Sequence, residues 1–159
     1  ISLMTAINNI AEKYRLPVVY GVHPRSLKFI QERRFEFSPL VRSLKPFGFL
    51  DYNKLQRNAF CVLSDSGTLS EESAILGFPG VLLRTSTERP EVLDKGHVVI
   101  GGIGTKEIEQ AVELCRAMLD HREPVSACPD YQDENVSVKV VKLIQSYTKI
   151  IRRDVWKES

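Results

Sequence analysis

The chain has 159 residues, of which 43% are hydrophobic and 26% charged, a composition typical of one soluble globular domain. The net charge is only +2 and the basic residues are scattered, which argues against nucleic-acid binding. We expect no membrane span, because no apolar run approaches ~20 residues, and no signal peptide is recognisable. Cys61, Cys115 and Cys128 are few and widely spaced, and they predict free thiols rather than a disulfide framework or a zinc site.

The first residues, ISLMTAINNIAEKYRLP, read as a helix that is already under way. Leu3, Ile7, Ile10 and Tyr14 recur at helical spacing. No N-cap signature stands before Ile1. We therefore expect the chain to be part of a longer protein.

Beyond this helix, predicted strands alternate with predicted helices. Strands are expected at 17–23, about 41–47, 59–64, 80–84 and 97–102, and helices at 24–34, 51–59, 67–76, 105–120 and 135–153. The run 59–64 is read as a continuous apolar run, as in a strand that is covered on both faces, and 80–84 is expected to be another buried strand. The alternation predicts an α/β fold, a Rossmann-like parallel sheet with helices on both faces, whose ligands bind at the carboxyl ends of the strands.

The predicted helix ends carry recognisable signals. Asp51 and Thr105 are expected to be N-caps, and Gly77 is expected to stop the helix before it. Leu69, Ser73 and Leu76 are expected to share a narrow inner face, and the helix at 105–120 is expected to turn Ile108, Val112, Cys115 and Leu119 inward.

A turn of small hydroxyl residues, Ser66, Gly67 and Thr68, lies between a predicted strand and the helix that follows it. A helix N-terminus offers unpaired N–H groups and about half a positive charge, so it binds phosphate well. Gly67 would let the backbone approach an oxygen closely, and the hydroxyl groups would add donors. The turn predicts a pyrophosphate cradle, although the same residues also serve as ordinary helix caps, and the turn alone leaves both interpretations open.

Two glutamates follow the turn, in the first turns of the predicted helix. The helix dipole favours Glu71 and Glu72 there without any ligand. A carboxylate one turn beyond a phosphate site is also well placed to accept hydrogen bonds from ribose hydroxyls, a role that an acid plays in the Rossmann fingerprint.

Other candidates follow neighbouring strands. His23 ends the strand 17–23 and could equally be a surface histidine. Arg89 follows the strand 80–84 and could bind phosphate in a bidentate way, or it could pair with Glu88 or Glu91. Aromatic residues in KPFGFLDY (45–52) could stack on a flat base, or Phe47 and Phe49 could belong to the core.

Competing phosphate motifs do not fit. The chain has no GxxxxGK[ST]. The segment GGIGTKE (101–107) begins like GxGxxG but lacks its third glycine. A Walker-type NTPase and an NAD enzyme are therefore disfavoured.

At this point the chain resembles a known family over essentially its whole length. The segments VHPR, KPFGFLDYNKLQRNAFCVLSDSGTLSEESAILGFPGVLLRTSTERPE and NVSVKVVKLIQSYTKIIRRDVW look like the C-terminal half of non-hydrolysing UDP-N-acetylglucosamine 2-epimerases. SDSGT, SEES and SYT are similar to the branch that forms UDP-N-acetyl-L-fucosamine. The resemblance implies one half of a GT-B architecture, two Rossmann-like domains that face each other across a cleft.

The resemblance also implies roles for individual residues. His23 matches a histidine near the diphosphate and is the candidate catalytic residue. The candidate substrate-binding residues are Tyr52 beside uracil, Ser66, Gly67 and Thr68 at the diphosphate, Glu72 at the ribose, and Arg89 of the ERP loop. Two positions depart from the family pattern: Phe47 stands where some members have a polar uracil contact, and many members have glycine in place of Thr68.

The family reaction inverts C2 of a UDP-2-acetamido sugar by eliminating UDP and adding it back. By resemblance, the acids that move the C2 proton belong to an N-terminal domain, toward which the helix at 136–153 is expected to pack. The 159 residues alone are expected to bind UDP at ~mM and not to epimerise. The resemblance further implies a cytoplasmic, bacterial-type enzyme of polysaccharide biosynthesis that is a homodimer at full length and needs no metal or other cofactor.

Three rival interpretations stay open at this point. A GT-B glycosyltransferase would share the fold and the nucleotide site but would require an acceptor. A hydrolysing epimerase would accumulate free UDP. A non-catalytic α/β binding domain would not depend on Ser66 or Arg89 for affinity.

Overall fold

The computed structural model describes residues 2–94, 98–120 and 128–158. The chain divides into two units, Ile1–Cys128 and Pro129–Ser159, which are described separately. The elements of the first unit are α1 Ser2–Tyr14, β1 Val18–Gly21, α2 Pro24–Glu32, β2 Val41–Leu44, α3 Phe49–Asn58, β3 Val62–Ser64, α4 Thr68–Leu76, β4 Gly80–Leu82, α5 Pro90–Asp94, β5 Val98–Ile100 and α6 Thr105–Asp120. The second unit holds a 3₁₀ turn, Pro129–Tyr131, and α7, Val136–Asp154.

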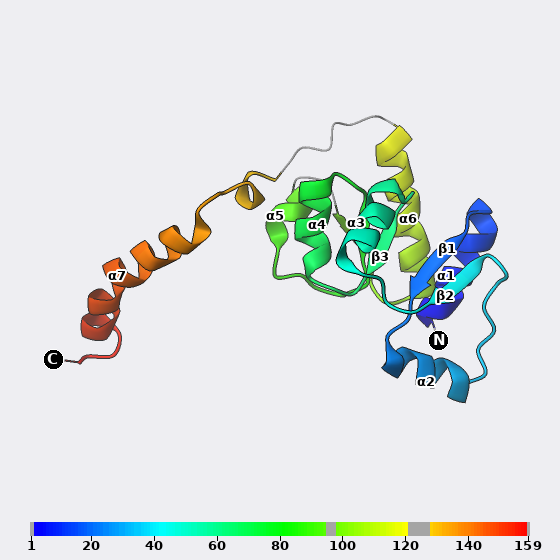
Figure 1. The fold of residues 1–159 in the computed structure, drawn as a ribbon, viewed down its shortest axis with the longest axis horizontal. Coiled ribbons are helices and arrows are strands. Elements are labelled where there is room, and N and C mark those ends of the chain that lie inside the picture. Colours follow the sequence, from blue (N-terminus) through cyan, green and yellow to red (C-terminus); the bar gives the residue numbers. More distant parts are fainter. Residues whose placement is uncertain (1, 95–97, 121–127, 159) are drawn as a thin grey trace. The chain divides into compact units, whose positions relative to one another are not determined.

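All the strand pairs of the first unit are parallel, as predicted, but the described strands form two sheets rather than one. One sheet joins β1 to β2, with Val18 opposite Val41, and the other has the order β3–β4–β5. The break falls between β1 and β3, where a cleft separates the two strands. Figure 1 shows the two sheets and the helices around them.

The central strand β4 is buried at every residue, which confirms that this run is covered on both faces. Val81 packs in one cluster with Ile108 and Val112 of α6, while Gly80 faces Leu69 of α4. Each fully buried aliphatic side chain of this kind stabilises the fold by about 1.5–3 kcal/mol. The α/β arrangement therefore follows from apolar residues on both sides of one short strand.

The neighbouring strand β3 contradicts the expectation. All three of its residues are only half-buried, whereas the sequence predicted a strand covered on both faces. The reason is its position, because β3 is an edge strand and its residues line the cleft.

The helix α1 packs against both sheets. Ala6 and Ile10 belong to the cluster around Val81, and Ile7 and Ala11 pack with Val41 of β2. The apolar residues of α1 thus pack on both sheets, and α1 connects the two sheets.

Two predicted caps are wrong. The helix α3 begins before Asp51, with Gly48 as its N-cap, and Asp51 lies in the first turn, where the helix dipole favours an acid. The helix α6 begins at Thr105, whose hydroxyl donates to the Ser2 carbonyl at 3.1 Å, while the Gly104 N–H donates to Glu107 at 2.9 Å. Phe49 is 77% exposed, so the alternative that placed it in the core is wrong as well.

Other expectations about the helices are confirmed. Gly77 ends α4 with φ 73°, a left-handed conformation that glycine adopts without strain. Leu69 and Ser73 are buried, although Leu76 is only half-buried. In α6, Ile108, Val112 and Cys115 are buried, and Leu119 lies outside the residues whose side chains are described.

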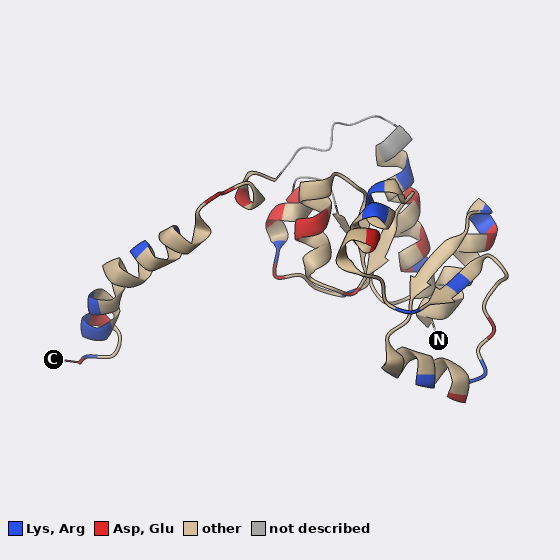
Figure 2. Ribbon diagram, viewed as in Figure 1, with Lys and Arg blue, Asp and Glu red and all other residues tan. Residues whose placement is uncertain are grey.

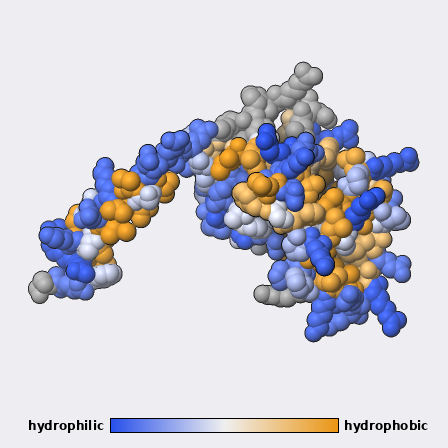
Figure 3. Space-filling view, in the orientation of Figure 1, coloured by the Kyte–Doolittle hydropathy of each residue, from blue (hydrophilic) through white to orange (hydrophobic). Residues whose placement is uncertain are grey.

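The second unit consists mainly of α7, a regular helix with no buried residue. Exposed apolar side chains recur along it, among them Val140, Leu143, Ile144, Tyr147 and Ile151, and Figure 3 shows hydrophobic residues gathered along the helix. An exposed apolar surface of this kind is typical of a protein contact.

The charges of the described residues are mixed in sign, and Figure 2 shows the basic residues spread over several elements. None of the described helices is long and apolar enough to cross a membrane.

Candidate functional site

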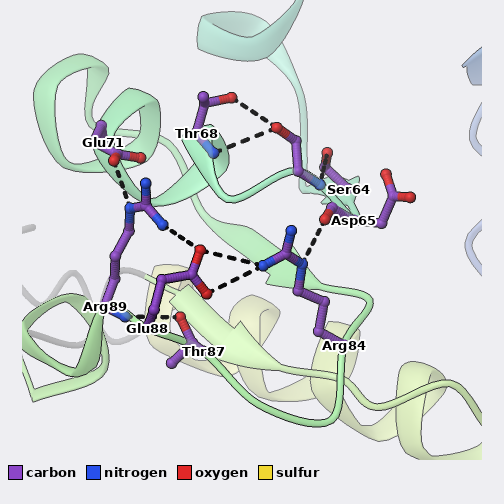
Figure 4. Close-up of polar contacts among 9 residues, drawn as sticks. Ser64, Asp65, Thr68, Glu71, Arg84, Thr87, Glu88 and Arg89 are labelled. Carbon is purple, nitrogen blue, oxygen red and sulfur yellow. Dashed lines mark hydrogen bonds and ion pairs between the residues drawn. The ribbon is translucent and has the colours of Figure 1, made fainter.

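The turn between β3 and α4 is held by its own hydroxyl groups. The Ser66 hydroxyl accepts a hydrogen bond from the Thr68 N–H at 3.3 Å and lies 2.9 Å from the Thr68 hydroxyl. The Ser66 N–H in turn donates to the Ser64 hydroxyl at 3.1 Å. Figure 4 shows these contacts around Thr68 and Ser64. The N-cap of α4 is Gly67, and the Ser66 hydroxyl binds the first N–H of the helix, an arrangement that leaves both interpretations of the turn open.

The expected set of unpaired N–H groups is not found at this helix end. The Leu69 N–H donates to the Ser66 carbonyl at 3.3 Å, and the Ser70 N–H donates to the Gly67 carbonyl at 3.2 Å. Such i to i+3 bonds have poorer geometry than those within an α-helix, and Ser66 and Thr68 are exposed. An anion that binds at the turn would have to replace the carbonyl groups as the acceptors of these weak hydrogen bonds.

Gly67 is needed for close approach rather than for an unusual backbone. Its φ is −61° and its ψ is −29°, values that any residue can adopt. A Cβ atom there would lie 2.9 Å from Nη1 of Arg89 and 3.1 Å from a carboxylate oxygen of Glu88. The absence of a side chain lets the guanidinium lie directly over the turn.

Arg89 is fixed by two carboxylates. Its Nε donates to Glu71 at 2.5 Å and its Nη1 donates to Glu88 at 2.5 Å; the hydrogen bond to Glu71 raises the pKa of Arg89. The two partners differ in exposure, because the Glu71 side chain is 30% exposed and that of Glu88 62%. Glu71 thus fixes the position of the guanidinium. The carboxylate of Glu88 is the partner that an anion could displace with little loss of free energy, because exposed ion pairs are weak.

A second arginine extends this network. Arg84 donates from Nε to the Asp65 carbonyl at 2.6 Å and forms an ion pair with Glu88 at 3.3 Å (Figure 4). The backbone N–H of Glu88, and then Arg89 and Arg84, lower the pKa of this exposed carboxyl. The sequence had named Glu88 as a possible partner of Arg89 but missed Glu71 and Arg84. Because β3 and β4 are parallel neighbours, the residues after both strands meet at one edge, and this was the signal that could have found them.

A second group of site residues lies between α3 and α4. Nε2 of Gln56 donates to Oε2 of Glu72 at 2.5 Å, and Gln56 is 2% exposed. Tyr52 lies one helical turn before Gln56. Burial, and then the charge of Glu72, raise the pKa of the Tyr52 phenol, so the three side chains are neighbours. The sequence predicted Tyr52 and Glu72 but missed Gln56, for which only its four-residue spacing from Tyr52 was a signal.

A cleft of about 1180 Å³ in the first unit is lined by β1, α3 and β3, and its lining includes His23, Phe47, Tyr52, Ser64 and Asp65. Among the described residues that follow β3, Asp65 is the last one that lines the cleft before the turn. The turn Ser66–Thr68 and Arg89 therefore lie beside the cleft rather than in its wall. The structure brings the predicted residues together in two groups, with His23 and Tyr52 both on the cleft.

Nowhere among the described residues do three or more His, Cys, Asp or Glu side chains lie close enough together to hold a metal ion. Cys61, Cys115 and Cys128 are not joined in disulfides. The polar groups of the site are hydroxyls, carboxylates, an amide and guanidinium groups, which suit a polar organic anion.

Comparison with known proteins gives this site a context. Residues 1–145 match the model of the family described as UDP-N-acetylglucosamine 2-epimerase. A UDP-N-acetylglucosamine 2-epimerase of Methanococcus maripaludis is 38% identical over 115 residues, which are 70% of this chain and 31% of that protein. One from Bacillus subtilis is 28% identical over 144 residues, which are 89% of this chain and 38% of that protein. This chain thus spans less than half of the length of these relatives.

Solved structures agree. The UDP-N-acetylglucosamine 2-epimerase of Rickettsia bellii has a TM-score of 0.76 and 32% identity, and the match covers 99% of this chain and 43% of that one. The Methanocaldococcus jannaschii enzyme, solved in complex with UDP-GlcNAc and UDP, has a TM-score of 0.76 and 25% identity over 91% of this chain and 40% of that one. The predicted resemblance is confirmed, and the chain belongs to the UDP-N-acetylglucosamine 2-epimerase family.

Proposed function

We propose that this chain is the UDP-sugar-binding part of an epimerase that inverts C2 of a UDP-2-acetamido sugar. The observation that supports this most is the position of Arg89. Glu71 holds its guanidinium, and the absence of a side chain on Gly67 leaves room for it over the start of α4, in a chain that belongs to this family. A diphosphate placed there would take the position of the exposed Glu88 carboxylate.

We assign the diphosphate to Ser66, Gly67, Thr68 and Arg89. The hydroxyl groups and the guanidinium are donors, and the helix end adds a partial positive charge. All four residues lie at one place in the first unit. We assign His23 to the same ligand, from the segment between β1 and α2, on the cleft that it lines.

We assign the nucleoside to the second group. Tyr52 is 36% exposed and lies on the cleft, so that its ring can stack on uracil. The Glu72 carboxylate is the acceptor for the ribose hydroxyls.

The chemistry explains why donors gather at the diphosphate. When the C2 proton is removed and the C1–O bond breaks, UDP departs with the bonding electron pair and a 2-acetamidoglycal remains. Negative charge then grows on the diphosphate oxygen. Fixed donors aimed at that oxygen stabilise the transition state more than the substrate.

We assign the groups that remove and return the C2 proton to another domain of the enzyme, which faces this one across a GT-B cleft. The exposed apolar residues of α7 would pack on that domain, and the full-length enzyme would be a homodimer. We place it in cytoplasmic polysaccharide biosynthesis, and the 6-deoxy UDP-sugar that leads to UDP-N-acetyl-L-fucosamine is a candidate substrate.

The test uses the full-length enzyme with UDP-N-acetylglucosamine and with the 6-deoxy substrate side by side, followed by NMR analysis of the products. The proposal expects the C2 epimer of one substrate without an acceptor. Accumulation of free UDP would indicate a hydrolase, and a product that forms only with an added acceptor would indicate a transferase. Turnover by the 159-residue chain alone would refute the division of labour between the domains.

A further inference from the structure

Gln56 is an unusual residue for its position in the fold. It is a long polar side chain that is 2% exposed, and it is the one residue of α3 that is buried. Its Oε1 atom has no hydrogen-bond partner in the part of the chain that the structure describes. A buried acceptor without a partner is destabilising. An apolar residue of similar size would therefore make the fold more stable, and the presence of an amide here indicates a function.

The contacts of the amide indicate what that function is. Its Nε2 donates to Oε2 of Glu72 at 2.5 Å, and this bond joins α3 to α4. Tyr52 lies one helical turn before Gln56 on α3, and burial, followed by the charge of Glu72, raises the pKa of its phenol. The buried amide thus binds one of the two side chains that we assign to the nucleoside and lies one helical turn from the other.

A carboxylate on a helix surface has several rotamers of similar energy. A hydrogen bond from a buried donor selects one of them and keeps it selected before a ligand arrives. Binding then orders fewer side chains and is stronger for the same contacts.

We propose that Gln56 is a positioning residue for nucleoside recognition. Its amide binds Oε2 of the Glu72 carboxylate and thereby presents the other carboxylate oxygen of Glu72 to the ribose hydroxyls. This inference rests on the proposed function, because it assumes that Glu72 accepts hydrogen bonds from ribose. It adds a residue that does not itself touch the ligand and acts through Glu72.

The test compares UDP with 2′,3′-dideoxy-UDP on the 159-residue chain, with affinities taken from chemical-shift titrations. The wild-type chain is expected to prefer UDP by about tenfold, the size of effect that a hydrogen bond to a charged group gives. In Gln56→Met this preference is expected to fall to about twofold, because Glu72 is no longer oriented. The matched control is Arg57→Met, an exposed neighbour on α3, which is expected to keep the full preference.

A second variant keeps the test decisive if Gln56→Met folds poorly. In Gln56→Glu two carboxyl groups would share the place of one hydrogen bond, and at neutral pH they repel each other. The preference is expected to be lost at pH ~7 and to return at pH ~5, where one carboxyl is protonated and donates to the other. A purely structural role would not give such a recovery.

The possible failures are distinguishable. If the wild-type chain does not bind UDP, the proposed function fails. If the wild-type chain binds UDP but the preference for the ribose hydroxyls is absent, or survives unchanged in both Gln56 variants, the positioning role of Gln56 is refuted while UDP binding stands.

Discussion

At the start of α4 the charged side chains around the turn are half-buried or exposed and are joined by ion pairs, whereas Glu72, further along the same helix, is bound by a buried amide of α3. The two ends of the proposed site are thus held in different ways. At the diphosphate end, the ion pair of Arg89 with Glu88 has to break before the ligand can bind. At the nucleoside end, the Glu72 side chain already has its orientation before the ligand binds. Such a division suits the proposed reaction, in which the bond between C1 of the sugar and the diphosphate oxygen breaks and forms again while the nucleoside stays bound.

The largest effect should come from the diphosphate end. We expect Arg89→Ala to weaken UDP binding by about tenfold to a hundredfold, because it removes a charged donor that Glu71 holds in place. The affinity for UDP, measured by titration, checks this. Lys28→Ala, which removes the same charge from an exposed position, should leave the affinity nearly unchanged. An equal loss in both variants would mean that only net charge matters.

A smaller loss is expected for Gly67→Ala. The backbone of Gly67 is acceptable to alanine, but the new Cβ would lie 2.9 Å from the Arg89 guanidinium and would displace it. We expect UDP affinity to fall about three- to tenfold while the free energy of unfolding changes by no more than about 0.5–1 kcal/mol. The control is Gly48→Ala, whose Cβ would have 3.9 Å to its nearest neighbour. If both variants bind UDP equally, the close approach of Arg89 has no role in binding.

The opposite sign is expected for Glu88→Gln. The carboxylate of Glu88 occupies the donor that a diphosphate would use, and an exposed ion pair of this kind is weak. Its removal should strengthen UDP binding about two- to fivefold at low salt, with less effect at high salt. Glu32→Gln changes the same charge at an equally exposed side chain and should have no effect. Weaker binding in Glu88→Gln would show that Glu88 supports the site instead of competing with the ligand.

The last prediction concerns the nucleoside end. Burial, followed by the nearby Glu72 charge, raises the pKa of Tyr52, so less than half of its phenol should be ionised at pH ~10, where an ordinary tyrosine is half ionised. An NMR titration of the ring signals would measure this. Glu72→Gln should bring the pKa down toward the ordinary value without reaching it, because the effect of burial remains. A Tyr52 that titrates normally would mean that the phenol is not packed beside Glu72.

The sequence predicted the order of most elements and the place of the turn, because both depend on local patterns, but it missed the short helix α5 and read 85–91 as a loop. Gly77 and the apolar run at β4 are examples, since each acts through its own neighbours in the chain. The ends of α3 and α6 were placed less well. There Gly48 is the N-cap of α3, and at α6 the Gly104 N–H donates a hydrogen bond to the Glu107 carboxylate, so the expected caps Asp51 and Thr105 are not used.

The contacts between elements could not be predicted in the same way. The pairing of Arg89 with Glu71 depends on where two strands end, and the sequence does not fix that distance. Gln56 was missed because a polar residue on a short helix predicts exposure, while its burial follows from the way α3 packs beside α4. The separation of β1 from β3 likewise depends on packing rather than on the pattern of either strand.

The most direct measurement is a residue-resolved titration of the 159-residue chain with UDP, with pyrophosphate and uridine titrated separately. Our account predicts that UDP shifts the amide signals from Ser64 to Glu72, those of Tyr52 and Gln56, and that of Arg89, at ~mM concentrations. Pyrophosphate should reproduce the changes at the turn, and uridine those at Tyr52 and Gln56. UDP-dependent shifts that spare both groups, or no binding at all at these concentrations, would contradict it.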